Sequence, residues 1–206
     1  MKKLLISSIL GVLCLSIFPI STFAYEYWYD PNNTDNAWEL LGGIDDGDLD
    51  IFADNNFTIN NTTYDFATEY RDAYSDWYSS VGPLYITESN RGTNKLWFYA
   101  DDYGEQGLNG WASFYLDGNR QQDCKSCSLE GNYDLAKTYL NAHDLEDGTP
   151  FTSAEVEAVA IHEIGHALGL SHEDDEDAVM NTYNVDTGNF NVLYDDYGVT
   201  NLYKNN

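Results

Sequence analysis

The stretch His162-Glu163-Ile164-Gly165-His166-Ala167-Leu168-Gly169-Leu170-Ser171-His172 is the most informative part of the chain. If it begins as a helix, His162 and His166 are four residues apart and project from one face. Imidazole nitrogens at that spacing can bind one Zn²⁺ at about 2.0–2.1 Å. Glu163 follows the first histidine, where its carboxylate reaches a water on the metal rather than the metal itself. The stretch therefore predicts a metal-binding helix.

The end of the stretch supplies a third ligand. Gly169 lies just past His166, where helices commonly end in a left-handed residue, a conformation that glycine adopts without strain. The chain can then reverse and bring in His172. Three protein ligands leave one coordination position open, which is typical of a catalytic zinc site rather than a structural one. Histidines packed in a core without metal would not explain the acid Glu163 on a largely apolar helix.

The start of the chain predicts a signal peptide over residues 1–24. Lys2 and Lys3 form a basic start, residues 4–20 are largely apolar, and Thr22-Phe23-Ala24 offers small residues at the two positions that signal peptidase reads. A membrane anchor is the alternative, but the apolar run is short for a span of about 20 residues. We therefore expect a secreted, extracellular protein with one domain over residues 25–206.

The chain carries a formal net charge of −26. Residues 1–24 hold two lysines and no acid, so their removal takes the charge to −28. Nucleic acid is excluded as a partner because phosphate contacts need a basic surface. The same charge argues against an anionic membrane surface as partner once the signal peptide is cleaved.

Clustered carboxylates are candidate calcium ligands, because Ca²⁺ prefers hard oxygen ligands. A solvated acidic surface that keeps a secreted protein soluble explains them equally well. The clusters are Asp45, Asp46, Asp48 and Asp50, the pair Asp101 and Asp102, and the run 173–177.

Two cysteines, Cys124 and Cys127, lie beyond the signal peptide. An oxidising compartment favours a local disulfide between them. A zinc knuckle would need a second pair of ligands, and a redox motif would need a βαβ setting, neither of which the sequence offers. Because the loop is very short, the disulfide should add little to global stability.

Hydrophobic periodicity predicts one domain that mixes strands and helices. Thr152 and Glu155 form a capping box before the zinc helix, and Thr62 with Asp65 resembles one before an earlier helix that ends near Ser80. That earlier helix carries a stripe of core aromatic residues: Phe66, Tyr70, Tyr74 and Trp77. Strands are expected over residues 49–53, 84–86, 95–100, 110–116 and 136–143, and residues 117–131 are expected to form a loop.

With these parts assembled, the chain resembles a secreted bacterial member of the matrixin branch of the metzincins. H-E-x-x-H-x-x-G-x-x-H is the metzincin zinc pattern, and Met180 supplies the methionine turn beneath the metal. The resemblance extends from about residue 37 to residue 203. Less specific similarities support it, over residues 38–43, 110–112, 138–141 and 195–203 and in the aromatic helix.

The resemblance implies an α+β metzincin fold: a twisted, mostly parallel five-stranded sheet with an antiparallel edge strand, and three helices. It implies one catalytic zinc on His162, His166 and His172. The expected activity is hydrolysis of internal bonds in protein or peptide substrates by a monomer, with Glu163 as general base for a zinc-activated water. The edge strand is assigned to Trp111–Leu116, and an extended substrate would pair with it around Trp111, Ala112, Ser113 and Phe114.

The chain also departs from the family pattern. Vertebrate matrixins hold a second, structural zinc mainly through histidines, but only His143 remains here, and Ser113 stands where one such ligand is expected. We therefore expect no second zinc and interpret His143 as a strand residue. Tyr183 lies three residues after Met180, whereas the zinc-binding tyrosine of astacins lies two after, so Tyr183 is not assigned to the metal. Calcium use in the family is consistent with a structural calcium ion.

Two other functions fit a zinc site. A catalytically silent zinc module used for binding would not need Glu163, and a casein-clearing assay with and without chelator separates it from a protease. A zinc hydrolase acting on a non-peptide bond is the second alternative, and a panel of ester and glycan substrates distinguishes it.

Overall fold

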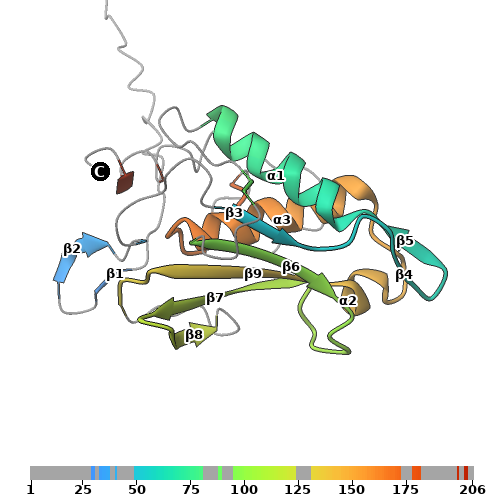
Figure 1. Ribbon diagram of the computed structural model, residues 1–206, viewed down its shortest axis with the longest axis horizontal. Coiled ribbons are helices and arrows are strands. Elements are labelled where there is room, and N and C mark those ends of the chain that lie inside the picture. The colour runs from blue at the N-terminus through green and yellow to red at the C-terminus, as the bar shows by residue number, and fades with distance from the viewer. Residues whose placement is uncertain are drawn as a thin grey trace, which may run out of the picture.

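A computed structural model places two long helices on one face of a five-stranded sheet (Figure 1). It describes residues 29–30, 33–37, 40, 49–80, 88–89, 95–123, 131–172, 178–181, 199 and 202–203. The strand order is β3 (Leu49–Phe52), β6 (Leu96–Asp101), β9 (Leu135–Asn141), β7 (Gly110–Leu116) and β8 (Asn119–Asp123). Strands β3, β6 and β9 are parallel, and β7 and β8 are antiparallel to their neighbours. The expected α+β fold is confirmed.

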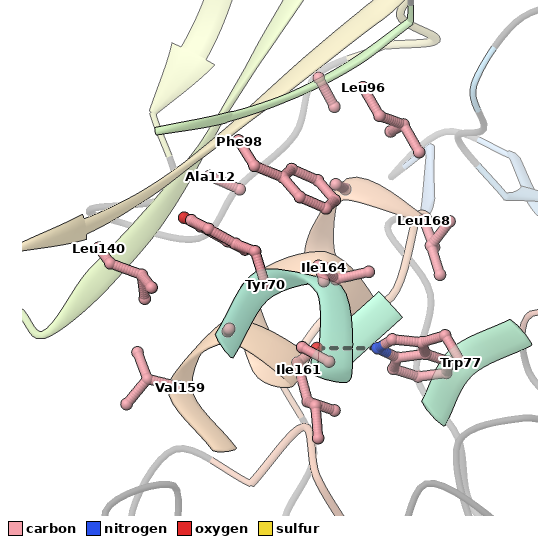
Figure 2. Packing of buried hydrophobic residues seen from close by; sticks show 14 of the residues in the cluster. Tyr70, Trp77, Leu96, Phe98, Ala112, Leu140, Val159, Ile161, Ile164 and Leu168 are labelled. Carbon is pink, nitrogen blue, oxygen red and sulfur yellow. Dashed lines mark hydrogen bonds between the residues drawn. The ribbon is translucent and has the colours of Figure 1, made fainter. Parts of the chain in front are cut away.

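The inner face of the sheet packs against helices α1 (Phe66–Ser80) and α3 (Ser153–Ala167). Alternate strand residues point inward, as the two-residue repeat of a strand requires. In Figure 2, Tyr70 of α1 and Phe98 of β6 lie side by side between helix and sheet, and their stacked rings have centroids 4.9 Å apart. The buried residues of this layer include Leu96, Phe98, Ala112, Phe114, Ala136, Leu140, Val159, Ile161 and Ile164. This core fixes α3, and hence the histidine stretch, against the sheet.

Helix α1 begins three residues later than the pair Thr62 and Asp65 predicts. Thr62 instead opens β5 (Thr62–Tyr64), which pairs with β4 (Phe57–Ile59) as a hairpin. The two turn residues Asn60 and Asn61 have φ of 45° and 73°, as a type I′ turn requires. Asp65 is the cap itself, because its Oδ1 accepts the N–H of Thr68 at 3.1 Å. The predicted capping box was therefore wrong.

The strand expected over residues 136–143 ends at Asn141, and His143 belongs to the short helix α2 (Ala142–Glu146). Asn141 caps this helix by accepting the N–H of His143 at 3.3 Å. The Nδ1 atom of His143 lies 3.4 Å from Oδ1 of Asp102. The interpretation of His143 as a strand residue was therefore wrong.

Strand β8 lies within residues that were expected to form a loop. Asp117 and Gly118 have φ of 52° and 74° and make a tight turn that brings β8 back along β7. Ser113 pairs with Asp123 and Phe114 pairs with Gln122. Strand β7 is antiparallel as expected, but over Ser113–Leu116 β8 is the outer strand. Two of the four residues proposed to pair with substrate thus pair with β8 instead.

The outer face of the sheet carries a row of stacked rings across four strands. Phe52, Tyr99, Tyr139 and Trp111 are register neighbours. The centroids of successive rings are 4.9, 5.3 and 5.0 Å apart, and the ring planes are nearly parallel. Beside this row, Lys137 places its ammonium 4.3 Å from the ring of Trp97, within the range of a cation–π contact.

Several expectations lie outside the described residues: the signal peptide, the strand at 84–86, Cys124 and Cys127, Tyr183, and most of the acidic clusters. Near the N-terminus, β1 (Tyr29–Asp30) and β2 (Asn33–Ala37) form a two-stranded sheet. Near the C-terminus, Val199, Leu202 and Tyr203 are helical, and the Tyr203 hydroxyl donates to the carbonyl of Leu168 at 3.1 Å. Among the described residues, no helix has the length and apolar character needed to span a membrane.

Candidate metal centre

Helix α3 begins at the predicted capping box. The Thr152 side chain accepts the N–H of Glu155, and the Glu155 carboxylate accepts the N–H of Thr152 at 2.7 Å. These bonds satisfy two of the four donors that a helix start leaves open. The backbone N–H and the hydroxyl of Thr152 both donate to the Glu155 carboxylate, and these two bonds lower the pKa of Glu155 because they favour its ionised form.

Helix α3 ends as the position of Gly169 predicts. Gly169 has a φ of 100°, and its N–H donates to the carbonyl of His166 at 2.9 Å. The N–H of Leu170 donates to the carbonyl of Gly165 at 3.0 Å, which completes a Schellman motif. The chain reverses at this point and returns His172 to the face that carries His162.

The three histidines meet at one point. Nε2 of His172 lies 3.0 Å from Nε2 of His162 and 3.2 Å from Nε2 of His166. Nitrogens bound to one tetrahedral zinc at about 2.0–2.1 Å would lie roughly 3.3–3.4 Å apart. Within the part of the chain that the structure describes, this is the one group of three or more His, Cys, Asp or Glu side chains that can hold a metal ion.

The other ring nitrogens of the two helical histidines face backbone carbonyls. Nδ1 of His162 lies 2.8 Å from the carbonyl oxygen of Val179, and Nδ1 of His166 lies 2.9 Å from that of Leu170. A carbonyl only accepts, so each Nδ1 must carry the proton and each Nε2 a lone pair. The lone pairs of these two Nε2 atoms therefore converge on the point that Nε2 of His172 also reaches. Three imidazole nitrogens form a donor set that zinc prefers.

Burial keeps His162 neutral. It is 4% exposed, and burial is the largest cause that holds its pKa well below the usual value. The charges that His166 and His172 would carry when protonated lower it further. Neutral imidazole is the form that binds a metal. The residues present therefore fit a zinc ion.

Met180 packs against α3 at Gly165, and its role in a methionine turn stays a prediction. It is 1% exposed, and a Cβ added to Gly165 would collide with its Sδ atom. The same Cβ would lie 3.1 Å from the ring of Trp77. Gly165 thus leaves the space that the Met180 side chain fills. Sequence reasoning did not assign this role, although Gly165 lies inside the histidine pattern.

Trp77 also holds α3 directly. Its indole Nε1–H donates to the carbonyl of Ile161 at 3.0 Å, beside the first histidine (Figure 2). The sequence predicted Trp77 as a core residue of the aromatic stripe, and it is fully buried. The contact with the metal helix was missed because it joins residues 84 positions apart.

Glu163 lies on the side of α3 that faces the sheet. It is 6% exposed and is close to Gly110, the first residue of β7. Strand β7 continues through Trp111 and Ala112, so the N-terminal end of the predicted substrate segment lies next to Glu163. The arrangement places one buried carboxylate on the helix that carries His162 and His166, next to the start of β7.

Two acids of the predicted calcium clusters have local partners. Asp101 Oδ1 accepts the N–H of Asp102 at 2.8 Å, and Asp102 Oδ1 accepts the N–H of Gly104 at 2.9 Å. Asp50 is fully buried on β3. Within the described residues, these carboxylates do not form a metal-binding group with other acids.

Comparison with known proteins agrees with this geometry. The matrixin (peptidase M10) family profile matches residues 43–204. Metalloendoproteinase 1-MMP of Arabidopsis thaliana is 35% identical over 125 residues, which cover 58% of this chain and 32% of the relative. Metalloendoproteinase 4-MMP of the same plant is 30% identical over 161 residues, covering 75% and 45%. The chain thus spans less than half the length of these curated relatives.

Proposed function

The chain belongs to the matrixin family, and from this premise we propose that it is a zinc-dependent endopeptidase that hydrolyses internal bonds of proteins or peptides. The convergence of His162, His166 and His172 beside the buried carboxylate of Glu163 is the observation that carries the proposal. The coverage of the family match, residues 43–204, supports it.

The three histidines would hold the zinc ion through Nε2, and the carbonyls of Val179 and Leu170 would keep His162 and His166 in the required tautomer. When bound, zinc acts as a Lewis acid that lowers the pKa of water and polarises a carbonyl group. Glu163 accepts the proton of the attacking water at its carboxylate and then delivers it to the departing amine. Burial of Glu163 excludes bulk water from this exchange.

The substrate would lie extended beside the start of β7. Trp111 and Ala112 are the residues of the predicted segment nearest to Gly110 and Glu163, and Ser113 already pairs with β8. Backbone hydrogen bonds to a strand align any peptide regardless of its sequence. Side-chain pockets would then decide which bonds are cut.

The setting of the enzyme is also proposed from the sequence. Residues 1–24 would be removed as a signal peptide, and residues 25–206 would form a secreted, monomeric catalytic domain. A disulfide between Cys124 and Cys127 suits the oxidising exterior. A structural calcium ion would draw on acids outside the described residues, and a lower melting temperature on calcium removal with zinc retained would support it.

The proposal is tested by incubating purified residues 25–206 with casein and mapping the new termini by mass spectrometry. Cleavage at internal bonds is expected with zinc present, and none is expected after chelation until zinc is restored. A zinc-loaded, folded protein that leaves casein and a peptide library intact would contradict the proposal. Ester or glycan cleavage by that same sample would favour the non-peptide hydrolase instead.

A further inference from the structure

Gly110, like Gly165, differs from most of the described glycines. Gly104, Gly118 and Gly148 have φ of 71°, 74° and 77°, and a Cβ added to any of them meets nothing within 4 Å. They are glycines because of their backbone conformation. Gly110 lies outside that positive-φ group. Backbone conformation therefore does not explain the glycine at position 110. The reason is that neighbouring atoms fill the place a side chain would take.

A side chain at position 110 would occupy the place of Glu163. A Cβ there would lie 2.8 Å from Cγ of Glu163 and 3.0 Å from its Oε1. It would also lie 2.9 Å from the carbonyl oxygen of Tyr139 in β9. Contacts this short force one of the partners to move.

We propose that Gly110 is a positioning residue for Glu163: its missing side chain leaves the space that the carboxylate arm of Glu163 fills. This inference rests on the proposed function, in which Glu163 exchanges the proton. Strand β7 would then do more than align a substrate, because its first residue also fixes the position of the Glu163 carboxylate.

Neither partner can retreat easily. Cγ is the middle of the Glu163 arm, which starts from a helix whose neighbours His162 and His166 are 4% and 2% exposed. The Tyr139 carbonyl belongs to a central strand paired on both sides. Of the two, the Glu163 side chain gives way at lower cost than the paired backbone of β9, so a methyl group at Gly110 should displace the carboxylate, with a small backbone shift that relieves the contact with the Tyr139 carbonyl.

Strand β7 is also prevented from moving away. The loop before Gly110 is held by two side chains at the start of α2. Asn141, which is fully buried, accepts the N–H of Tyr103 at 3.1 Å through its side-chain oxygen. Asp144 accepts the N–H of Leu108 at 3.0 Å. The approach of Gly110 to Glu163 is therefore fixed from both sides.

The first test is the Gly110→Ala variant of the zinc-loaded protein. We expect zinc content to stay at the parent level, kcat to fall at least about tenfold, and KM to change less than about twofold. Displacement of a proton-transfer group lowers kcat without removing ground-state contacts. A variant with parental kcat, or with a loss confined to KM, would overturn the proposal.

The second test measures the contact without using activity. Melting temperatures are compared for the parent, Gly110→Ala, Glu163→Ala and the double variant. We expect Gly110→Ala to lower the melting temperature by at least about 4 °C in the parent and by less than half as much when Glu163 is alanine. Equal lowering in both backgrounds would mean that the Tyr139 carbonyl decides the requirement for glycine, and would overturn the proposal.

Gly148→Ala is the matched control, because Gly148 has open space and lies between α2 and α3. Because of backbone strain, Gly148→Ala should lower the melting temperature equally whether residue 163 is Glu or Ala. The kcat of the protein with Glu163 should be unchanged. If Gly110→Ala does not fold while the double variant does, the steric contact is supported; if neither folds, it is contradicted. Should the parent cleave no peptide, the proposed function fails, but the melting cycle still decides on the contact.

Discussion

The two halves of α3 carry polar side chains under opposite conditions. In the N-terminal half, Glu155 and Glu157 are partly exposed, and Glu155 completes the capping box. In the C-terminal half, His162, Glu163 and His166 are 4%, 6% and 2% exposed. A buried polar group costs stability unless it is bonded or binds a metal. The first half therefore serves the stability of the helix and the second half the chemistry, and substitutions should separate the two.

The largest effect is expected for His166→Ala, which removes a ligand from the C-terminal half. Zinc should fall from about one ion per chain to near zero, because two histidines hold zinc poorly. Hydrolysis of casein should be lost with it. Elemental analysis and the casein assay measure both, and His143→Ala, on α2, is the control that should retain its zinc. Zinc retained in the His166 variant would remove His166 from the ligand set.

Glu163→Gln should separate catalyst from ligand within the same half. The amide is nearly isosteric, so zinc and the fold should remain while peptide hydrolysis falls by about 10²–10⁴, the usual contribution of a positioned acid–base group. Glu157→Gln makes the same chemical change in the other half of the helix and should keep full activity. Parental rates in a zinc-loaded Glu163→Gln protein would overturn the role of general base.

Thr152→Ala should affect the N-terminal half alone. Loss of the cap should lower stability by about 1 kcal/mol, or roughly 2–4 °C in melting temperature for a domain of this size. Both kcat and zinc content should be unchanged. Thr149→Ala, at an exposed position just before the helix, is the control and should melt like the parent. A fall in kcat would mean that the two halves are coupled.

The effect expected at Glu157 is no larger than that at Thr152, and it depends on pH. Partial burial, with the nearby carboxylates of Asp76, Asp72 and Glu69 on α1, raises the pKa of Glu157 to about 7. Because this pKa lies above that of the unfolded chain, the contribution of Glu157 to stability is present below about pH 4.5 and lost as pH rises through 7.

The melting temperature of Glu157→Gln should therefore be about 2–4 °C above that of the parent at pH 8, a range that allows for solvent screening. Near pH 4.5 the two melting temperatures should be equal. Glu105→Gln, in the exposed loop after β6, is the control for the change from carboxylate to amide at an exposed position. A pH-independent difference would assign the effect to packing rather than to charge.

Sequence reasoning succeeded where local rules act. The capping box at Thr152, the left-handed Gly169 and strand β7 all follow from neighbours in the chain. It failed at β8, because Asn119–Asp123 has no apolar alternation to mark a strand. The Asp117-Gly118 pair before it is a hairpin signal and could have been used.

Other features of the site needed the folded chain. The approach of Gly110 to Glu163 and the bond from Trp77 to Ile161 join residues that are distant in sequence. No periodicity or spacing predicts which glycine meets which acid. Tertiary packing decides this, so the ligands were predicted and the residues that position them were not.

The aromatic row on the outer face gives the sheet an optical signature. Its rings, from Phe52 to Trp111, are stacked at about 5 Å across four strands. Chromophores held this close share their electronic transitions, and near-ultraviolet circular dichroism is lost when such fixed packing is lost. Trp77, buried on the opposite side of the sheet, gives a second signal from the helix layer. Denaturation followed through both would reveal whether the two layers melt together or one after the other.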